Sequence, residues 1–271
     1  NNPIELDRRL ILKGPFDDPV ANDAHASEYS TFLDRSNRDS SSLCGSCHDI
    51  VLDNGLHLEQ TFEEWQETVF ADESTLTNCG NCHMYSVGPP GNELDRSPRP
   101  IADADGVRAR DFHDHRMPGV DVALTPFPER ESYTARVQDF LKATVRTQLC
   151  VNPIPGGFTL LVGLENVSAG HAFPSGATQD RRVWAQIEAF AADDRLWSEG
   201  MVGEGEPVVD AAPGVLLADR LCDADGAETH MFWEAATKER NVLEGIRVFG
   251  REETRVFSFE VVQGRVPDRV T

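Results

Sequence analysis

Two short motifs limit what this chain can fold into more than any other feature of its sequence. Residues 44–48 read CGSCH and residues 79–83 read CGNCH. Both have the C-x-x-C-H spacing of covalent haem attachment, in which two thiols reach the vinyl groups at one porphyrin edge and the next imidazole reaches the iron. The motifs therefore predict two haem c groups, with thioether bonds from Cys44, Cys47, Cys79 and Cys82 and proximal iron ligands from His48 and His83.

A zinc site built from four cysteines is the main alternative, and a redox-active dithiol is another. Thirty-one residues separate Cys47 from Cys79, whereas about 15–20 residues separate the cysteine pairs of the usual zinc pattern. A zinc site also does not need a histidine directly after both pairs. The sequence therefore favours haem.

Two further cysteines, Cys150 and Cys222, lie outside the motifs. Haem is attached outside the cytoplasm, where disulfides are stable, so we expect a periplasmic or extracellular protein. A Cys150–Cys222 disulfide is one prediction, and two separate buried thiols are the other. The given chain begins Asn1-Asn2-Pro3, without a basic and then apolar leader, so we expect a mature or trimmed form of an exported protein.

The chain is strongly acidic, with 46 Asp and Glu against 25 Lys and Arg and a formal net charge of -21. This charge argues against binding to nucleic acid, and no run approaches the roughly 18 apolar residues of a membrane helix. Eleven acidic residues and no basic one lie from Asp39 to Asp95, a span that holds both motifs. We expect either that a basic redox partner docks there or that the span is a solvated acidic face.

The segment between the motifs predicts a helix over residues 61–72. Its apolar residues recur at i, i+3, i+7 and i+8 from Phe62, which places them on one face. We expect Trp65 and Phe70 on this face to pack against a porphyrin, the alternative being that the face is ordinary protein core.

The ends of the predicted helices follow from local signals. Thr61 and Glu64 match the capping box that opens a helix. A 3.6-residue period over 129–149 predicts a second helix, which ends before Asn152 and Pro153.

Beyond residue 155 the pattern changes to strands. Runs rich in Val, Phe, Leu and Ile cover 158–166, 182–191 and 253–262. The predicted fold class is α+β: a mostly irregular and helical haem-binding region, followed by an antiparallel β-sandwich. The predicted domains are a dihaem region (1–128), a connecting helix and linker (129–155) and the β-sandwich (156–271).

The sixth ligand of each iron decides what such a protein does, because a second strong ligand favours electron transfer and an open position admits a substrate. Six histidines lie outside the motifs. We expect His57 and His230 to be solvated surface residues. His113 competes for the ligand role with His115, two positions on. The candidate distal ligands are His25, His115 and His171.

Six segments of the chain, 44–48, 62–68, 79–84, 115–119, 170–176 and 181–184, resemble those of the multihaem c-type cytochromes, including relatives of the tetrahaem electron carriers of ammonia oxidisers. The resemblance covers roughly residues 40–190. It implies His48 and His83 as proximal ligands and His115 and His171 as distal candidates. Phe70 stands where related helices often carry a histidine, which implies that the missing ligand comes from elsewhere, such as a loop or another subunit. Family members tend to carry more than two haems, so the resemblance also implies that this chain is one link in a longer relay.

The predicted function is electron transfer between redox partners through two bis-His haems, without catalysis. One alternative is a subunit of an extracellular cytochrome filament or surface conduit, which predicts a homo-oligomer. The other is a haem enzyme, a peroxidase or oxyanion reductase, in which one iron keeps an open position.

Overall fold

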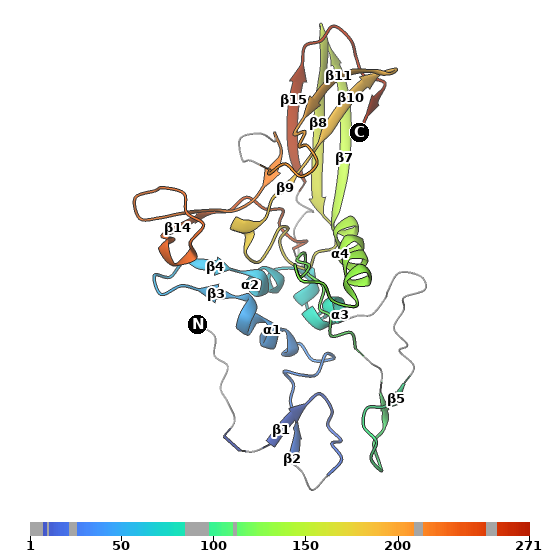
Figure 1. Cartoon of the computed structure of the whole chain (residues 1–271), viewed down its shortest axis with the longest axis vertical. Coiled ribbons are helices and arrows are strands. Elements are labelled where there is room, and N and C mark those ends of the chain that lie inside the picture. Colours follow the sequence, from blue (N-terminus) through green and yellow to red (C-terminus); the bar gives the residue numbers. More distant parts are fainter. Residues whose placement is uncertain are drawn as a thin grey trace.

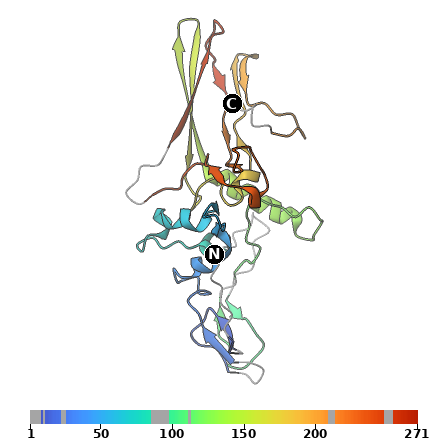
Figure 2. The ribbon, with the colours of Figure 1, turned by 90° about the vertical axis from the view of Figure 1, so that its left-hand side faces the viewer.

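The computed structural model describes residues 8–9, 11–21, 26–84, 98–110, 113–208, 214–247 and 254–271. The molecule is elongated (Figure 1). Long strands occupy one end, short helices lie in the middle, and two small strand pairs occupy the other end. The longest helix lies where the long strands meet the short helices, and Figure 2 shows it running across that junction.

The described elements follow one another in a mixed order of helices and strands. The helices are α1 (Ser40–His48), α2 (Thr61–Gln66), η1 (Val69–Ala71), α3 (Cys79–His83), α4 (Arg130–Thr144), η2 (Thr178–Asp180) and η3 (Phe232–Glu234). The strands are β1 (Ile11–Gly14), β2 (Ala26–Tyr29), β3 (Ile50–Val51), β4 (His57–Glu59), β5 (Arg99–Pro100), β6 (Ala109–Arg110), β7 (Val145–Ile154), β8 (Gly157–Asn166), β9 (Val183–Trp184), β10 (Ile187–Ala191), β11 (Asp194–Glu199), β12 (Leu216–Leu217), β13 (Arg220–Cys222), β14 (Thr237–Glu239), β15 (Arg255–Val261) and β16 (Arg269–Val270).

The main hydrophobic core lies in the strand-rich half. Strand β8 is central, with β7 on one side and β15 on the other, both antiparallel to it. Phe158, Leu160 and Val162 alternate along β8 and are fully or almost fully buried, because every second side chain of a strand points to the same face. They pack with Leu217 and Leu243 from later segments.

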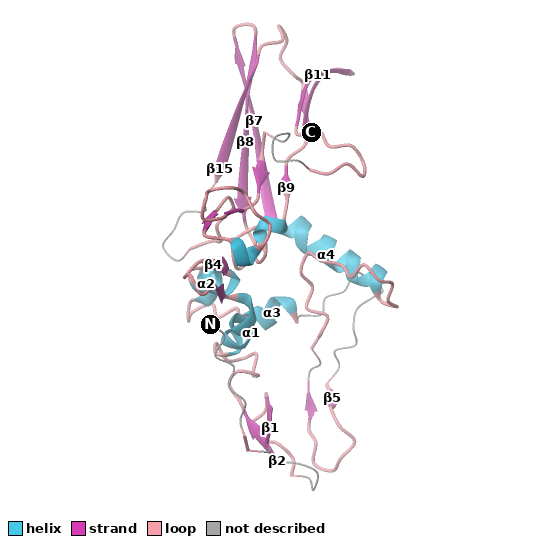
Figure 3. Cartoon of the chain, turned by 60° about the vertical axis from the view of Figure 1, so that its left-hand side comes forward, coloured by secondary structure: helices cyan, strands magenta, loops and turns pink. Residues whose placement is uncertain are grey.

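The mixed class predicted from the sequence is confirmed. The strands form several sheets of two or three strands that do not close (Figure 3), so a sandwich is not confirmed. Sheet β15-β8-β7 and sheet β11-β10-β16 are the two largest. The region predicted as irregular and helical also contains strand pairs, among them the parallel pair β1 and β2.

The helix predicted over 129–149 is wrong at its C-terminal end. Helix α4 ends at Thr144, and the chain continues directly into β7. Strand β7 pairs with β8 along its whole length, from Val145 opposite Asn166 to Ile154 opposite Gly157. Ten residues of continuous pairing outweigh the helical period of 145–149, since helix propensity is a weak preference that tertiary contacts override.

The helix predicted over 61–72 is also shorter than expected. Helix α2 ends at Gln66, and the backbone N–H and the hydroxyl of Thr68 both donate to the Trp65 carbonyl, at 3.0 and 2.8 Å. Val69 then donates to the Ile246 carbonyl at 2.8 Å. A contact with a segment about 180 residues later therefore ends the helix.

A second, smaller core joins the two halves of the chain. Leu58 on β4 is buried with Leu221 on β13 and Ala235. The ammonium group of Lys238 donates to the Leu58 carbonyl and to Gln60, at 3.2 and 2.8 Å. The β13–β14 hairpin therefore packs against the β3–β4 hairpin that follows the first C-x-x-C-H motif.

The predicted Cys150–Cys222 disulfide is wrong for this structure, in which both residues are free thiols. Cys150 is exposed on β7, whereas Cys222 is buried on β13. The two strands belong to different sheets, and their side chains lie in opposite environments. Among the described residues, no helix combines the length and the apolar character required to span a membrane.

Candidate haem-attachment sites

The first motif forms the second half of α1, which ends at His48. Gly45 is buried against the Phe62 ring of α2, and a Cβ at this position would lie 2.4 Å from the Phe62 Cγ. Glycine therefore lets α1 and α2 approach closely. Cys47 is exposed, and the His48 side chain is 62% exposed, so this motif faces outward.

The second motif forms α3, a helix of only five residues. Asn78 caps it: its side chain accepts from the Asn81 N–H at 3.0 Å, and the Asn81 side chain accepts from the Asn78 N–H at 2.9 Å. This reciprocal capping box satisfies two amides of the first turn. The Asn-x-x-Asn spacing in the sequence is a signal that could have predicted it.

The two motifs lie side by side (Figure 3). The Cys79 N–H donates to the Ser41 hydroxyl at 3.2 Å, which ties α3 to α1. The thiols of Cys44 and Cys79 share a hydrogen bond that raises the pKa of Cys44 and lowers the pKa of Cys79 to about 6. The first cysteine of each motif therefore lies next to that of the other, and the second cysteines, Cys47 and Cys82, are both exposed.

Each motif histidine has a partner for its Nδ1 atom. His48 Nδ1 lies 2.9 Å from Glu59 Oε1, and this hydrogen bond raises the pKa of His48. His83 Nδ1 lies 2.8 Å from the Pro118 carbonyl oxygen. Because a carbonyl only accepts, Nδ1 of His83 carries the proton and Nε2 keeps the lone pair that a metal needs.

The same arrangement recurs at His171. Its Nδ1 lies 2.8 Å from the Ala172 carbonyl oxygen, so its Nε2 also keeps a lone pair. Desolvation by the surrounding protein lowers the pKa of both His83 and His171. This shift favours the neutral form of both rings, which is the protonation state of a metal ligand.

The rings of His83 and His171 lie 6.3 Å apart between centroids, and their planes differ by 17°. With metal–imidazole bonds of about 2.0–2.1 Å, two imidazoles on opposite sides of one metal ion have centres about 6–7 Å apart. At this spacing the two rings could hold one iron between them.

The remaining candidates are placed differently. His115 is exposed in the loop after residue 112, and His25 lies outside the described residues. Trp65 is buried, and its Nε1 donates to the Thr77 carbonyl at 2.9 Å. Trp65 and Phe70 both pack close to Gly170, beside His171. Their expected contact with a porphyrin remains a prediction.

Comparison with known proteins gives one structural match and no match in sequence. A solved structure, a penta-haem cytochrome c552 from Thermochromatium tepidum, superposes with a TM-score of 0.57 and 20% sequence identity. The match covers 96% of this chain. The chain therefore shares its fold with part of this penta-haem cytochrome. It spans 58% of the length of the solved structure. No protein-family model matches the sequence, and no curated protein matches it.

The fold brings residues to the site that the sequence alone did not indicate. Glu59 and Pro118 hold the motif histidines, and Glu64 contacts the loop of His171 rather than capping α2. The α2 N-cap is Gln60, which makes no side-chain capping hydrogen bond. The capping-box prediction at Thr61 and Glu64 is therefore wrong.

Replacing Gly45 with alanine should destabilise the folded chain by about 1–3 kcal/mol, because the added Cβ overlaps the Phe62 ring. That ring stacks on the Trp65 ring at 5.7 Å, so a shift of Phe62 would disturb this contact. Chemical denaturation measures the change. Gly14→Ala is the matched control, since its Cβ would meet nothing within 4 Å. Equal stability of the two variants would contradict the close approach of α1 and α2.

Proposed function

We propose that this chain is a dihaem c-type cytochrome that transfers electrons between redox partners through two covalently bound, bis-His haems. The observation that carries the proposal is the pair His83 and His171, which lies at the ring spacing of two ligands on one iron. The multihaem fold and the two C-x-x-C-H motifs support it independently. In this function the redox partners supply and accept the electrons, so the protein needs no small-molecule substrate.

The cysteines and histidines of the chain hold the cofactor in this proposal. Bound haem c supplies an iron that alternates between ferrous and ferric. Cys79 and Cys82 would hold it covalently, and His83 and His171 would be the two ligands of its iron. Because their Nδ1 atoms donate to backbone carbonyls, the rings keep their orientation in both oxidation states. Little rearrangement then accompanies electron transfer.

Transfer between the two haems is supported by the arrangement of the motifs. The thiols of Cys44 and Cys79 are in hydrogen-bond contact, and α1 and α3 are linked through Ser41. Attachment at these cysteines brings one edge of each porphyrin close to the other. The exposed His48 makes the first haem the one that meets a partner.

The remaining parts of the proposal rest on the sequence. We assign His115 or His25 as the distal ligand of the His48 haem. The protein is periplasmic or extracellular, and a basic partner docks on the acidic span around the motifs. Residues 1–128 form the haem-binding region and 156–271 a β-sandwich domain, with the hairpin β13–β14 of the latter packed against the former.

Haem stoichiometry and spin state test the proposal. The protein, produced with the c-type haem attachment machinery, should carry two haems per chain by the pyridine haemochrome assay. Electron paramagnetic resonance of the ferric protein should show low-spin signals. A redox protein should reoxidise the reduced protein in the absence of any small-molecule substrate. A single haem, or a high-spin signal from the His83 haem, would contradict it.

A further inference from the structure

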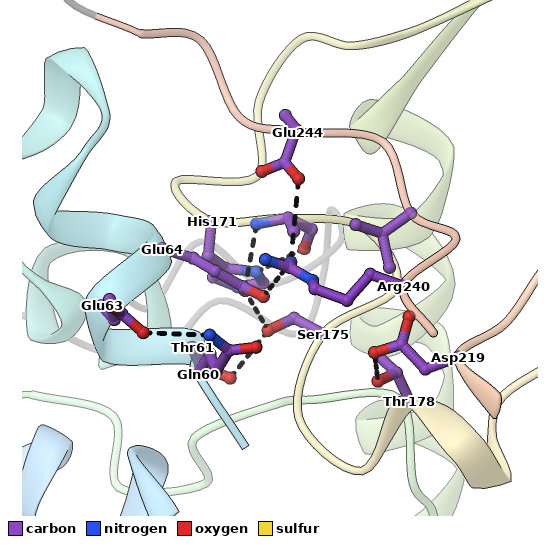
Figure 4. Close-up of polar contacts among 12 residues, drawn as sticks. Gln60, Thr61, Glu63, Glu64, His171, Ser175, Thr178, Asp219, Arg240 and Glu244 are labelled. Carbon is purple, nitrogen blue, oxygen red and sulfur yellow. Dashed lines mark hydrogen bonds and ion pairs between the residues drawn. The ribbon is translucent and has the colours of Figure 1, made fainter. Parts of the chain in front are cut away.

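The loop that carries His171, here called the His171 loop (residues 170–176), is held by a residue of α2. Glu64 Oε2 accepts from the Ala172 N–H at 3.2 Å and from the Ser175 hydroxyl at 2.6 Å. Glu64 Oε1 accepts from Arg240 at 2.7 Å. Figure 4 shows these groups converging beside His171. One carboxylate thus joins the His171 loop to the helix between the two haem motifs.

We propose that Glu64 is a positioning residue, which holds the His171 loop so that His171 reaches the iron of the haem attached at Cys79 and Cys82. The proposal rests on the function proposed above and deepens it. Glu64 acts through its contacts with Ala172 and Ser175, which lie one and four positions after His171.

The burial of Glu64 makes this contact strong. Its side chain is only 8% exposed, so its hydrogen bonds compete little with water. Burial raises the pKa of Glu64, and the Arg240 guanidinium and the Ser175 hydroxyl oppose that shift. A carboxylate that accepts from a backbone N–H, a hydroxyl and a guanidinium is satisfied where it lies.

Contacts from both halves of the chain hold the His171 loop. The Asn166 side chain donates to the His171 carbonyl at 2.7 Å, and Phe173 pairs with Leu243 through two backbone bonds of 2.8 Å. These partners belong to the strand-rich half. From the other half, the Thr61 hydroxyl lies 2.7 Å from that of Ser175, and the Thr68 hydroxyl donates to the Gly170 carbonyl at 3.4 Å. Glu64 supplies two further contacts from this half, so it helps to set the position of the His171 loop relative to α3, which follows α2 in the chain.

An axial ligand tolerates little displacement, because productive geometry is held within about 0.5 Å by its supporting residues. Loss of a supporting partner typically weakens a metal–ligand interaction about 10- to 100-fold. The variant Glu64→Ala should therefore let carbon monoxide displace His171 from the ferrous haem at a concentration lower by about that factor. Glu64→Gln keeps one acceptor oxygen and should show a smaller change in the same direction.

Carbon monoxide titration of the reduced, haem-loaded protein provides the test. Glu244→Gln is the matched control, since Glu244 also pairs with Arg240, at 3.8 Å, from outside the His171 loop. It should titrate like the parent protein. Equal shifts in Glu64→Ala and Glu244→Gln would overturn the proposal, because the effect would then belong to Arg240. An unchanged titration in Glu64→Ala would also overturn it.

Two further variants separate the possible failures. His171→Ala should open the same iron fully, and a spectrum unchanged by His171→Ala would overturn the ligand assignment in the proposed function itself. If Glu64→Ala contains less haem or less secondary structure than the parent, the same carbon monoxide titration is made on Ser175→Ala, which removes one hydrogen-bond donor to Glu64. A carbon monoxide concentration lowered several fold supports the positioning role. An unchanged concentration overturns it.

Discussion

A chain in which Cys79 and Cys82 are both replaced by alanine should carry one haem in place of two. In the proposed function these thiols attach the second haem, and α3 has only five residues, too few to be stable without tertiary partners. Loss of this haem also removes the group that we propose to join His83 to His171. We therefore expect lower thermal stability as well as half the haem absorbance per chain.

Mass spectrometry of the denatured protein measures the covalent haem number directly. Cys150→Ala is the matched control, because Cys150 is an exposed free thiol outside both motifs. It should keep two haems and the parent stability. Retention of two haems by the double variant would show that the second motif does not attach haem. A zinc site or a redox-active dithiol would then be the better interpretation of its cysteines.

The replacement of His171 by alanine should convert one haem from six-coordinate, low-spin iron to a high-spin form that binds exogenous ligands. The physical reason is the spacing of the two rings, since His171 is the imidazole that lies 6.3 Å from that of His83. The ferric spectrum should gain a high-spin signal from about half of the haem iron, and the reduced protein should bind one additional carbon monoxide per chain.

A histidine at the surface provides the control for this second prediction. The His230 side chain is 60% exposed and lies 3.8 Å from Asp180, so His230→Ala should leave both haem spectra unchanged. If His171→Ala keeps the parent spectrum, another residue is the sixth ligand of that haem. Addition of imidazole should restore the low-spin signal of His171→Ala, as expected when the missing group is the ligand alone.

The comparison of α2 with its prediction shows how far local patterns extend. The apolar spacing located a helix between the motifs correctly, because that spacing depends on neighbours within two turns. The end of the helix and the role of Glu64 depend on residues 171–175 and 240–247, which lie more than 100 positions away. No pattern within the helix carries that information.

Strand β7 illustrates the same limit. Its first residues continue the helical period of α4, yet they pair with β8 from Val145 onward. The sequence leaves open whether Cys150 and Cys222 form a disulfide or stay as two buried thiols, whereas the sheets expose Cys150 and bury Cys222. In both cases long-range packing decides the outcome. For β7 it outweighs a local helix preference worth less than about 1 kcal/mol per residue.

The sequence by itself determined the spacing of the attachment motifs, since the two C-x-x-C-H motifs bring thiols and imidazole together within five consecutive residues. It also narrowed the candidates for distal ligands to a few loop histidines. Only the tertiary structure decided that His171 lies beside His83, because 88 positions separate them and the contact depends on how β8, α2 and α3 meet. The spacing within a motif follows from neighbouring residues of the chain, whereas two distant histidines meet only once the two halves have packed together.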